Sequence, residues 1–491
     1  MRSALAVALL VATPAMAEIR FERVPLPVDH VYSGGWEHFV GGGVAILDCD
    51  GDALPEIVAA GGTEPMRLFR NRGGMEFVPG DLPDLRGTTG AYPLDMDADG
   101  ILDLYVLRVG PDVVLKGSAD CRFRDATAEL ELDPPDAWST AFTAWWAEGD
   151  DRPTLAVGHY VDRSDPDGPF EACDDNLLWR PRPEGGWTAE VLAPGYCPLS
   201  MLAAEDARGR PTLRISNDRH YYVRGGSEQM WDIGEARFLG PEDGWEGPML
   251  WGMGIASRDL TGDGRDEVML TSMGDQLLQI ATPGGYVAAP YEMGTTAHRP
   301  HVGEDGRPST GWHAEFGDVD NDGLADLFIA KGNVDQMPGL AMEDPNTLLR
   351  QMPDGRFVEV AAEAGIATTD RSRGAALADL DGDGLLDLVV VNRRAPMELW
   401  RNVTEPAGGW IGIDLRQPGG NGRAVGARVR VGDQSQQMTV GGGHAGGEAG
   451  PLHFGLGADP GPVTVTVRWP DGAVTDHPDL VPGAVHHVLR P

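Results

Sequence analysis

The sequence has very little lysine and no long apolar run. Lys116 and Lys331 are its only lysines, and 76 acidic against 39 basic residues give a formal net charge of −37. Nucleic acid and anionic membrane surfaces repel such a charge, so neither is expected as a partner. No apolar run approaches the roughly 18 residues that a membrane-spanning helix needs, so no membrane insertion is expected.

A short apolar stretch lies at the N-terminus. The sequence MRSALAVALLVATPAMA joins Arg2 to an apolar core over residues 4–12 and to a small-x-small pattern that ends at Ala17. This order is typical of a secretory signal peptide. We expect a signal peptide over residues 1–17, cleavage after Ala17, and a secreted or periplasmic monomer. The sequence does not choose between the two compartments.

Cysteine is also scarce. Only Cys49, Cys121, Cys173 and Cys197 are present, and no two of them have a CxxC spacing, so zinc or thioredoxin-type chemistry has no support. An even number of cysteines in an exported chain permits two disulfides. We prefer the pair Cys173–Cys197 because both residues lie in loop-like segments, and Cys49–Cys121 then follows.

Common catalytic motifs are missing as well. The sequence contains no GxSxG, HExxH or P-loop motif. Its histidines offer no clear alternative: we expect His313 to be an exposed loop residue, His298 and His301 to lie in a long loop, and His444 to lie in a Gly-rich turn. We therefore assign no catalytic residue and no organic cofactor, and a non-enzymatic role is favoured.

The chain does contain a repeat. An apolar strand enters an acidic loop, a second apolar strand leaves it, and a strand such as LFRN and then an aromatic-centred strand follow. Two degenerate units, near residues 146 and 204, keep the strands but lose most acidic positions, which brings the number of units to seven. The five acidic loops are DCDGDALPE (48–56), DMDADGILD (95–103), DLTGDGRDE (259–267), DVDNDGLAD (318–326) and DLDGDGLLD (379–387).

The aromatic strands give an independent count of seven. The first, over residues 19–24, precedes any acidic loop, and the last acidic loop has no aromatic strand of its own. The simplest topology is a ring closed by this N-terminal strand, which leaves no open sheet edge. The aromatic markers are Phe21, Phe77, Phe123, Trp187, Phe238, Tyr286 and Phe357.

These patterns predict an all-β fold with two parts. Residues 18–404 are expected to form a seven-bladed β-propeller. Residues 405–409 are expected to form a linker. Residues 410–491, with short alternating strands between Gly-rich turns, are expected to form a small β-sandwich-like domain.

The acidic loops have the composition of a calcium site. In DxDxDGxxD, carboxylates at positions 1, 3, 5 and 9 converge, glycine at position 6 permits a sharp turn, and the carbonyl of position 7 can join them. Carboxylates so close repel one another unless a cation lies among them, and oxygen-only ligation favours Ca²⁺ over Mg²⁺ or a transition metal. We predict about five structural Ca²⁺ ions, held by Asp48, Asp50, Asp52, Glu56, Asp95, Asp97, Asp99, Ile101, Asp103, Asp259, Thr261, Asp263, Arg265, Glu267, Asp318, Asp320, Asp322, Leu324, Asp326, Asp379, Asp381, Asp383, Leu385 and Asp387.

Not all loops match equally. Loop 48–56 has Ala53 in place of glycine and a glutamate at position 9, and loop 259–267 has Thr261 at position 3 and a glutamate at position 9. These two are expected to bind more weakly than the other three. The segments near residues 146 and 204 offer too few carboxylates, so we expect them to be metal-free.

The repeats resemble the FG-GAP/VCBS repeats of integrin α-subunit propellers and of many bacterial exported proteins. The segments GARVRV (426–431), VGGGHAGG (440–447), LHFGLG (452–457) and VTVRWPDG (465–472) resemble the ASPIC/UnbV domain. Together they resemble the bacterial relatives of cartilage acidic protein. The resemblance implies an integrin-α-like propeller, calcium binding and an extracellular setting, but no defined reaction. The animal proteins carry a Cys-rich module that this chain lacks, so a matrix role is not carried over.

Two hypotheses about function remain. The first is a binding or scaffold protein whose long loops contact an unidentified protein or glycan, and it is favoured because such loops are rich in Trp, Tyr, His and Pro. The second is a polysaccharide-acting hydrolase or lyase, which needs a carboxylate pair in a pocket outside the calcium loops. The sequence names no such pair. The contact loops are expected over 159–175, 195–200, 291–312 and 333–346.

Overall fold

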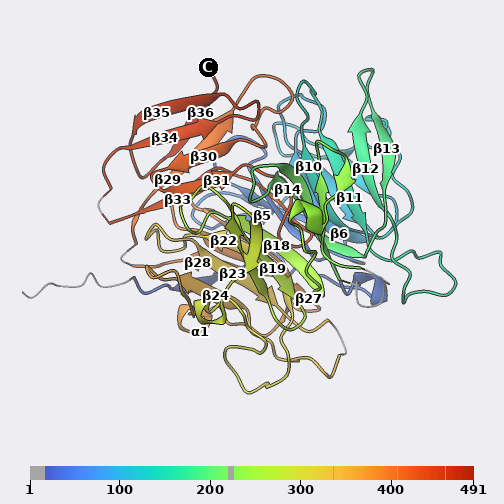
Figure 1. Ribbon diagram of the computed structural model, residues 1–491, viewed down its shortest axis with the longest axis horizontal. Helices are drawn as coiled ribbons and strands as arrows, with labels where there is room; N and C mark the ends of the chain where they lie inside the picture. Colours follow the sequence, from blue (N-terminus) through green and yellow to red (C-terminus); the bar gives the residue numbers. More distant parts are fainter. Residues whose placement is uncertain (1–16, 219–225, 335–336, 406, 459) are drawn as a thin grey trace, which may run out of the picture.

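The computed structural model describes residues 17–218, 226–334, 337–405, 407–458 and 460–491. The signal peptide expected over residues 1–17 lies outside these residues apart from Ala17, and the expected linker and contact loops fall partly outside them. Strands dominate, and within the described residues no helix is both long enough and apolar enough to span a membrane. Figure 1 shows these strands in many small sheets.

Seven sheets of four antiparallel strands follow one another along the chain, and their number equals that of the repeat units. The first to third sheets contain β2 (Val44–Leu47), β3 (Glu56–Ala59), β4 (Arg67–Asn71) and β5 (Phe77–Pro79); β6 (Thr88–Leu94), β7 (Asp103–Arg108), β8 (Val113–Lys116) and β9 (Arg124–Asp125); and β10 (Ser139–Trp145), β11 (Thr154–His159), β12 (Asn176–Pro181) and β13 (Trp187–Leu192). The fourth to sixth contain β14 (Pro198–Glu205), β15 (Pro211–Asn217), β16 (Gln229–Asp232) and β17 (Arg237–Phe238); β18 (Gly252–Arg258), β19 (Glu267–Ser272), β20 (Leu277–Thr282) and β21 (Gly285–Ala288); and β22 (Gly311–Gly317), β23 (Asp326–Lys331), β24 (Thr347–Gln351) and β25 (Phe357–Glu359).

The seventh sheet joins the two ends of this region. Its strands are β26 (Arg371–Ala378), β27 (Asp387–Arg393) and β28 (Glu398–Asn402), and its fourth strand is the N-terminal β1 (Phe21–Val24), which pairs antiparallel with β28. The first strand of each sheet contacts the next sheet, and β26 contacts β2, so the seven sheets form a closed ring. The all-β propeller class predicted from the sequence is confirmed.

The first strands are buried along nearly their whole length, as in β6, where all seven residues are buried. They lie between two neighbouring sheets, which explains their apolar and small side chains. Between the second and third sheets, for example, Tyr105 stacks on Phe142 with a centroid distance of 4.4 Å. The helical segments are short: η1 (Trp36–His38), η2 (Pro241–Asp243), η3 (Tyr291–Met293) and α1 (Ala361–Ala364).

The C-terminal region forms two sheets that share one core. Ile413, Val429 and Val467 are fully buried between them, which gives the sandwich-like domain that the alternating pattern predicts. In Figure 1 this domain, in orange to red, lies on one side of the ring. One sheet contains β29 (Gly409–Arg416), β33 (Leu452–Gly457) and β36 (Val485–Leu489), and the other contains β30 (Arg428–Val431), β31 (Gln434–Gln437), β34 (Val463–Arg468) and β35 (Val474–Leu480).

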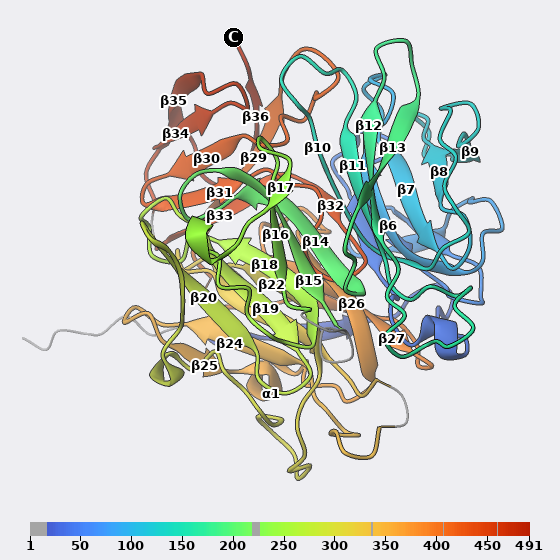
Figure 2. The same ribbon diagram turned by 45° about the vertical axis from the view of Figure 1, so that its right-hand side comes forward.

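The Gly-rich run of this domain does not form an ordinary turn. We call residues 440–449 the channel segment because they enter the centre of the ring, where β32 (Glu448–Ala449) pairs in parallel with β2. The segment also makes β-bridges to the first strands β6, β10, β14 and β18, and its His444 N–H donates to His313 of β22. Figure 2 shows β32 among these first strands. The C-terminal domain thus fills the channel of the ring.

Glycine is required along this path because the backbones approach closely. A Cβ added at Gly43 or Gly90 would lie 1.7 or 1.9 Å from the Ala445 carbonyl oxygen, and one at Gly446 would lie 2.0 Å from that of Val44. Real Cβ atoms are essentially never that close to a backbone oxygen, so no side chain fits at these positions.

The expectation for His313 is wrong, whereas His444 lies in a turn of the Gly-rich run as expected. His313 is not an exposed loop residue but part of β22, and only 5% of its surface is exposed. His444 is completely buried in the channel, where its Nε2 accepts the Gly41 N–H at 3.2 Å. Both residues pack inside the ring, which sequence periodicity alone does not reveal.

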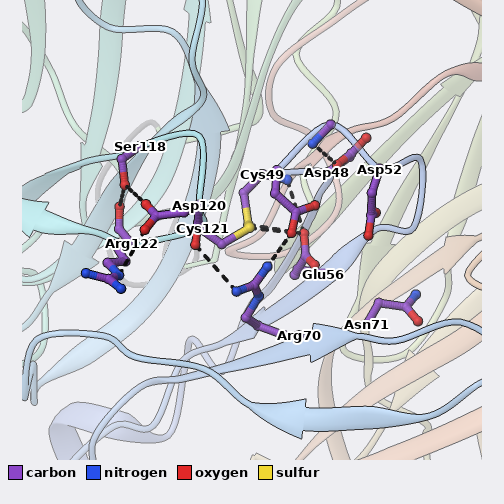
Figure 3. The surroundings of a disulfide bond; sticks show 12 residues. Asp48, Cys49, Asp52, Glu56, Arg70, Asn71, Ser118, Asp120, Cys121 and Arg122 are labelled. Carbon is purple, nitrogen blue, oxygen red and sulfur yellow. Dashed lines mark hydrogen bonds and ion pairs between the residues drawn. A yellow bond between two sulfur atoms is a disulfide. The ribbon is translucent and has the colours of Figure 1, made fainter.

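Both expected disulfides are present. Cys173–Cys197 joins the long β11–β12 loop to the short β13–β14 connection, and Cys49–Cys121 joins the first acidic loop to the second sheet, with Cα–Cα distances of 5.0 and 5.1 Å. Figure 3 shows the second bond beside Glu56, whose carboxylate accepts the Cys49 N–H at 3.1 Å. The preferred pairing is confirmed.

Candidate metal centres and the face that carries them

Each acidic loop winds around the carboxylate at its first position. In the second sheet, Asp95 accepts the N–H groups of Ala98 at 2.8 Å and Gly100 at 2.9 Å, and Asp99 accepts that of Ile101 at 2.9 Å. Gly100, at position 6, has a φ of 84°, in the left-handed region that glycine tolerates. Loop 48–56 places Ala53 there with a φ of 68°, so its alanine is strained where the other loops have glycine.

The carboxylate at position 9 links the loop to the sheet. Asp103 accepts the Met96 N–H at 3.0 Å and, with its other oxygen, the Gly117 N–H at 2.9 Å just after the third strand. Three other loops repeat this pair of bonds. The equivalents are Glu267 with Leu260 and Ala281, Asp326 with Val319 and Gln351, and Asp387 with Leu380 and Asn402.

Four of the five loops bring three carboxylates together. In each of them, one oxygen from each of three residues lies within 4.8 Å of the other two. Loop 259–267 forms no such group among the described residues, because Thr261 replaces a carboxylate and the exposed Asp263 pairs with Arg265 at 2.8 Å. The four groups are Asp48, Asp50 and Glu56; Asp95, Asp97 and Asp99; Asp318, Asp320 and Asp326; and Asp379, Asp381 and Asp387.

Burial and mutual repulsion make the ionised form of the loop carboxyl groups unfavourable. Glu56, Asp103 and Glu267 each have a pKa raised to about 7, mainly by burial and also by the neighbouring loop carboxylates. Backbone hydrogen bonds to these groups lower the pKa but do not offset the rise. Burial also raises the pKa of Asp326 and Asp387 well above its usual range. A cation among them would remove this penalty.

A basic side chain from the third strand reaches four of the loops. We call Arg70, Lys116, Arg350 and Arg401 the basic arms. Each pairs with the position-3 carboxylate, and all but Arg70 also pair with the one at position 5. In Figure 3, Arg70 lies between the loop and the Cys121 segment. In the fifth sheet, the corresponding position of β20 is Ile280.

The basic arms neither neutralise all the loop carboxylates nor pair with all of their oxygen atoms. In loop 95–103, one lysine faces four carboxylates, so a net negative charge remains. In Asp50, Asp97 and Asp320, the second carboxylate oxygen, Oδ1, is buried and has no hydrogen-bond partner among the described residues. Oxygen-only donors, excess negative charge and unpartnered buried oxygens fit a hard divalent cation such as Ca²⁺.

All five loops lie on the face of the ring that the C-terminal domain covers. Ser435 donates to Asp259 at 2.9 Å, and Arg428 makes a bidentate pair with Asp266 at 2.8 and 3.2 Å. In the sixth and seventh sheets, the Gly408 N–H donates to the Asp320 carbonyl at 2.9 Å, and His453 Nε2 lies 3.1 Å from the Gly384 carbonyl oxygen. The acidic loops are therefore also the docking surface for this domain.

Sequence reasoning missed a buried carboxyl pair. Glu315 of β22 and Glu448 of the channel segment are hydrogen-bonded to each other, and Glu315 also accepts the Leu377 N–H at 3.0 Å. Burial raises the pKa of Glu315 to about 8 and that of Glu448 well above its usual range. The two residues are 133 positions apart, since 448 minus 315 is 133, so no local motif marks the pair.

Comparison with known families supports both parts of the chain. Residues 48–106 and 318–390 match the FG-GAP-like repeat, and residues 417–490 match the ASPIC and UnbV domain. The molecule is thus an all-β propeller protein, and it carries FG-GAP-like repeats followed by a C-terminal ASPIC/UnbV domain. The resemblance to FG-GAP repeats and to the ASPIC/UnbV domain, stated from the sequence, is confirmed. No curated protein matches the chain significantly.

Several solved structures align with most of this chain. The BP39L lectin from Burkholderia pseudomallei is 10% identical, with a TM-score of 0.49 over 75% of this chain and 97% of its own. BBS1N in complex with ARL6DN is 11% identical, with a TM-score of 0.47 over 77% and 96%. YCF48 bound to D1 peptide is 11% identical, with a TM-score of 0.45 over 79% and 99%. Similarity at this level carries no conclusion about function.

Proposed function

We propose that the protein is an exported, calcium-loaded propeller that acts as a non-enzymatic binding scaffold. The observation that carries this proposal is the set of carboxylate groups on one face of the ring, each with more negative charge than its basic arm balances. Calcium would hold each loop between two strands of its sheet. Because the same loops contact the C-terminal domain, calcium would also hold that domain on the ring.

The binding surface is proposed on the opposite face. The loops from second to third strands and between sheets leave the ring there, and they include the described parts of the expected contact loops 159–175, 195–200, 291–312 and 333–346. Trp36 on this face is 47% exposed and packs against the buried Trp138 at a centroid distance of 4.9 Å. Rigid, exposed aromatic side chains are typical of protein- and glycan-binding surfaces.

The geometry of the carboxyl pair favours binding over polysaccharide hydrolysis. Glycosidases hold their two carboxyl groups about 5–9.5 Å apart so that a sugar bond or a water fits between them. Glu315 and Glu448 are instead in direct hydrogen-bond contact, which leaves no such space.

Calcium removal tests the metal part of the proposal. At a tenfold excess of Ca²⁺ over Kd, each site contributes about 1.4 kcal/mol to the free energy of unfolding. Five sites in a chain of this size then correspond to a rise in Tm of about 5–10 °C. We expect EDTA to lower the Tm by this amount and millimolar Ca²⁺ to restore it, with about five ions per chain by elemental mass spectrometry. An unchanged Tm, or a metal-free chain after dialysis against Ca²⁺, would contradict the proposal.

A matched pair of variants separates the loops from general acidity. Asp326→Asn removes a buried position-9 ligand, whereas Asp354→Asn removes an exposed carboxylate in the β24–β25 turn of the same sheet. We expect Asp326→Asn to lose one bound ion and Asp354→Asn to lose none. A glycan array and a pull-down with the calcium-loaded chain then test the binding face, with Trp36→Ala as the variant expected to lose the captured ligand.

A further inference from the structure

A large cavity lies between the ring and the C-terminal domain. Its volume is about 1010 Å³, within the range of small-molecule sites, and a smaller cavity of about 220 Å³ adjoins it. The walls combine residues of the first, second, fifth, sixth and seventh sheets with residues of β29 and β33. Apolar side chains line much of it, among them Ile46, Phe316, Leu377, Trp410 and Leu452.

Arg258, at the end of β18, lines both cavities, and only 8% of its surface is exposed. Across the described residues, no hydrogen bond and no ion pair within 4 Å joins its guanidinium to a protein group. Its nearest ring contact is the face of Phe454, with 5.8 Å to the centroid. A buried cation without a partner is costly, so the site is suited to an anion that is supplied from outside the chain.

The acidic groups around Arg258 are already engaged. Asp266 is held by the two bonds from Arg428, and Asp259 accepts Ser435 and three backbone N–H groups of its own loop. Asp318 likewise accepts the N–H groups of Asp322 and Gly323 in its own loop. Glu315 and Glu448, which line the same two cavities, are hydrogen-bonded to each other. The hydrogen-bonding capacity of Arg258 is therefore left for a ligand.

The charge distribution also orients such a ligand. Asp48, Asp50, Asp95 and Asp99 lie on the walls contributed by the first and second sheets, so an anionic group is repelled there. Two further arginines of the lining, Arg416 and Arg423, are paired with Asp414 at 2.9 and 3.5 Å, so the anionic group is attracted toward Arg258. The apolar walls then contact the remainder of the molecule.

We propose that the inter-domain cavity binds a small organic anion with an apolar body, whose anionic group pairs with Arg258. This site lies on the side of the ring opposite to the proposed binding face, and it does not depend on that face. The Glu315–Glu448 pair forms the polar wall beside the anion.

Two fluorescent probes test the site, because they share one body and differ in charge. 8-Anilinonaphthalene-1-sulfonate carries a sulfonate, and N-phenyl-1-naphthylamine lacks it. With the full mature chain in millimolar Ca²⁺, we expect the sulfonate to bind at a single saturable site. Arg258→Gln is expected to weaken it about tenfold or more, because a hydrogen bond to a charged group is lost, and to leave the neutral probe unchanged.

Matched variants keep the test interpretable. Arg258→Lys retains the charge and is expected to retain more sulfonate binding than Arg258→Gln. Arg356 is an exposed arginine in the β24–β25 turn, so Arg356→Gln is expected to bind the sulfonate as the natural chain does. If Arg258→Gln does not fold, Leu452→Trp tests the cavity by filling it from β33, and both probes should then lose their site. Equal sulfonate affinity in the natural chain and Arg258→Gln, or unchanged binding of both probes by Leu452→Trp, overturns the proposal.

Discussion

Gly446 lies where the channel segment leaves no room for a side chain. A Cβ at this position would lie 2.0 Å from the Val44 carbonyl oxygen of β2 and 2.9 Å from the Val44 nitrogen. Contacts below 3.0 Å are essentially absent from real structures, so Gly446→Ala requires one of the two backbones to move by about 1 Å. Both backbones are held in β-structure, and neither can rotate away as a flexible side chain would.

The size of the effect follows from the contacts at risk. Overpacking a close-packed interior costs about 1–3 kcal/mol. The same shift weakens two backbone hydrogen bonds of 3.2 Å, from Ile46 N–H to the Gly447 carbonyl and from Ala91 N–H to the Ala445 carbonyl. Each such bond contributes about 0.5–1.5 kcal/mol. We therefore expect Gly446→Ala to lower the free energy of unfolding by about 2–6 kcal/mol.

Urea unfolding followed by tryptophan fluorescence measures this loss. Gly450→Ala is the matched control, because a Cβ there meets nothing within 4 Å and its φ lies outside the left-handed region. The control is expected to stay within about 0.5 kcal/mol of the natural chain. Thermolysin should also cleave the chain faster in Gly446→Ala, since the C-terminal domain is less firmly held. If the two variants unfold alike, the channel segment does not occupy the centre of the ring as described.

Three further predictions concern buried charge and strain. Arg350→Met leaves the fully buried Asp320 without its basic arm, so thermal unfolding in EDTA should show a loss of about 3–5 kcal/mol, and Ca²⁺ should reduce that loss; an equal loss in both buffers would count against a cation at this loop. Ala53→Gly relieves a left-handed alanine and should add about 1 kcal/mol in the same assay, a gain that a strain-free loop would not show. Burial raises the pKa of Glu315 from its ordinary 4.5 to about 8. Between these pH values the folded state binds more protons than the unfolded state, so the free energy of unfolding falls as pH rises. Glu448→Gln removes one member of the pair and should flatten this fall, which reaches about 1.4 kcal/mol per pH unit for one group; identical slopes in urea titrations at pH 5, 6.5 and 8 would exclude the pair as its source.

Much of the ring was predictable because each repeat unit is a local structure. The loop from Asp95 to Asp103 and the strands beside it are adjacent in the chain, so their order and periodicity are written in the sequence. The role of the N-terminal strand was also predictable, since Phe21 is an aromatic marker that no acidic loop precedes. Its pairing with β28 then closes the seventh sheet.

The candidate site was predictable only in part. The carboxylates at positions 1, 3, 5 and 9 follow from one short motif, and four of the five loops bring three of them together. The basic arms were visible as a recurring residue in the third strand, but their direction was not. A strand residue can point to either face of a sheet, and the register between β3 and β4 decides that Arg70 faces the loop.

By itself, the sequence determined the all-β class, the number of repeat units and the acidic loops, because each depends on residues close in the chain or on a regular period. It favoured one pairing of the cysteines, which the structure confirmed. Only the tertiary structure decided where the Gly-rich segment 440–449 goes. Its partners lie on six different sheets, from Val44 to His313, and no period in the sequence connects them. That segment brings Glu448 to Glu315, and the domain that carries it encloses the cavity beside Arg258. The closure of the ring brings the backbones of the channel segment and the first strands so close that no side chain fits at Gly43, Gly90 or Gly446.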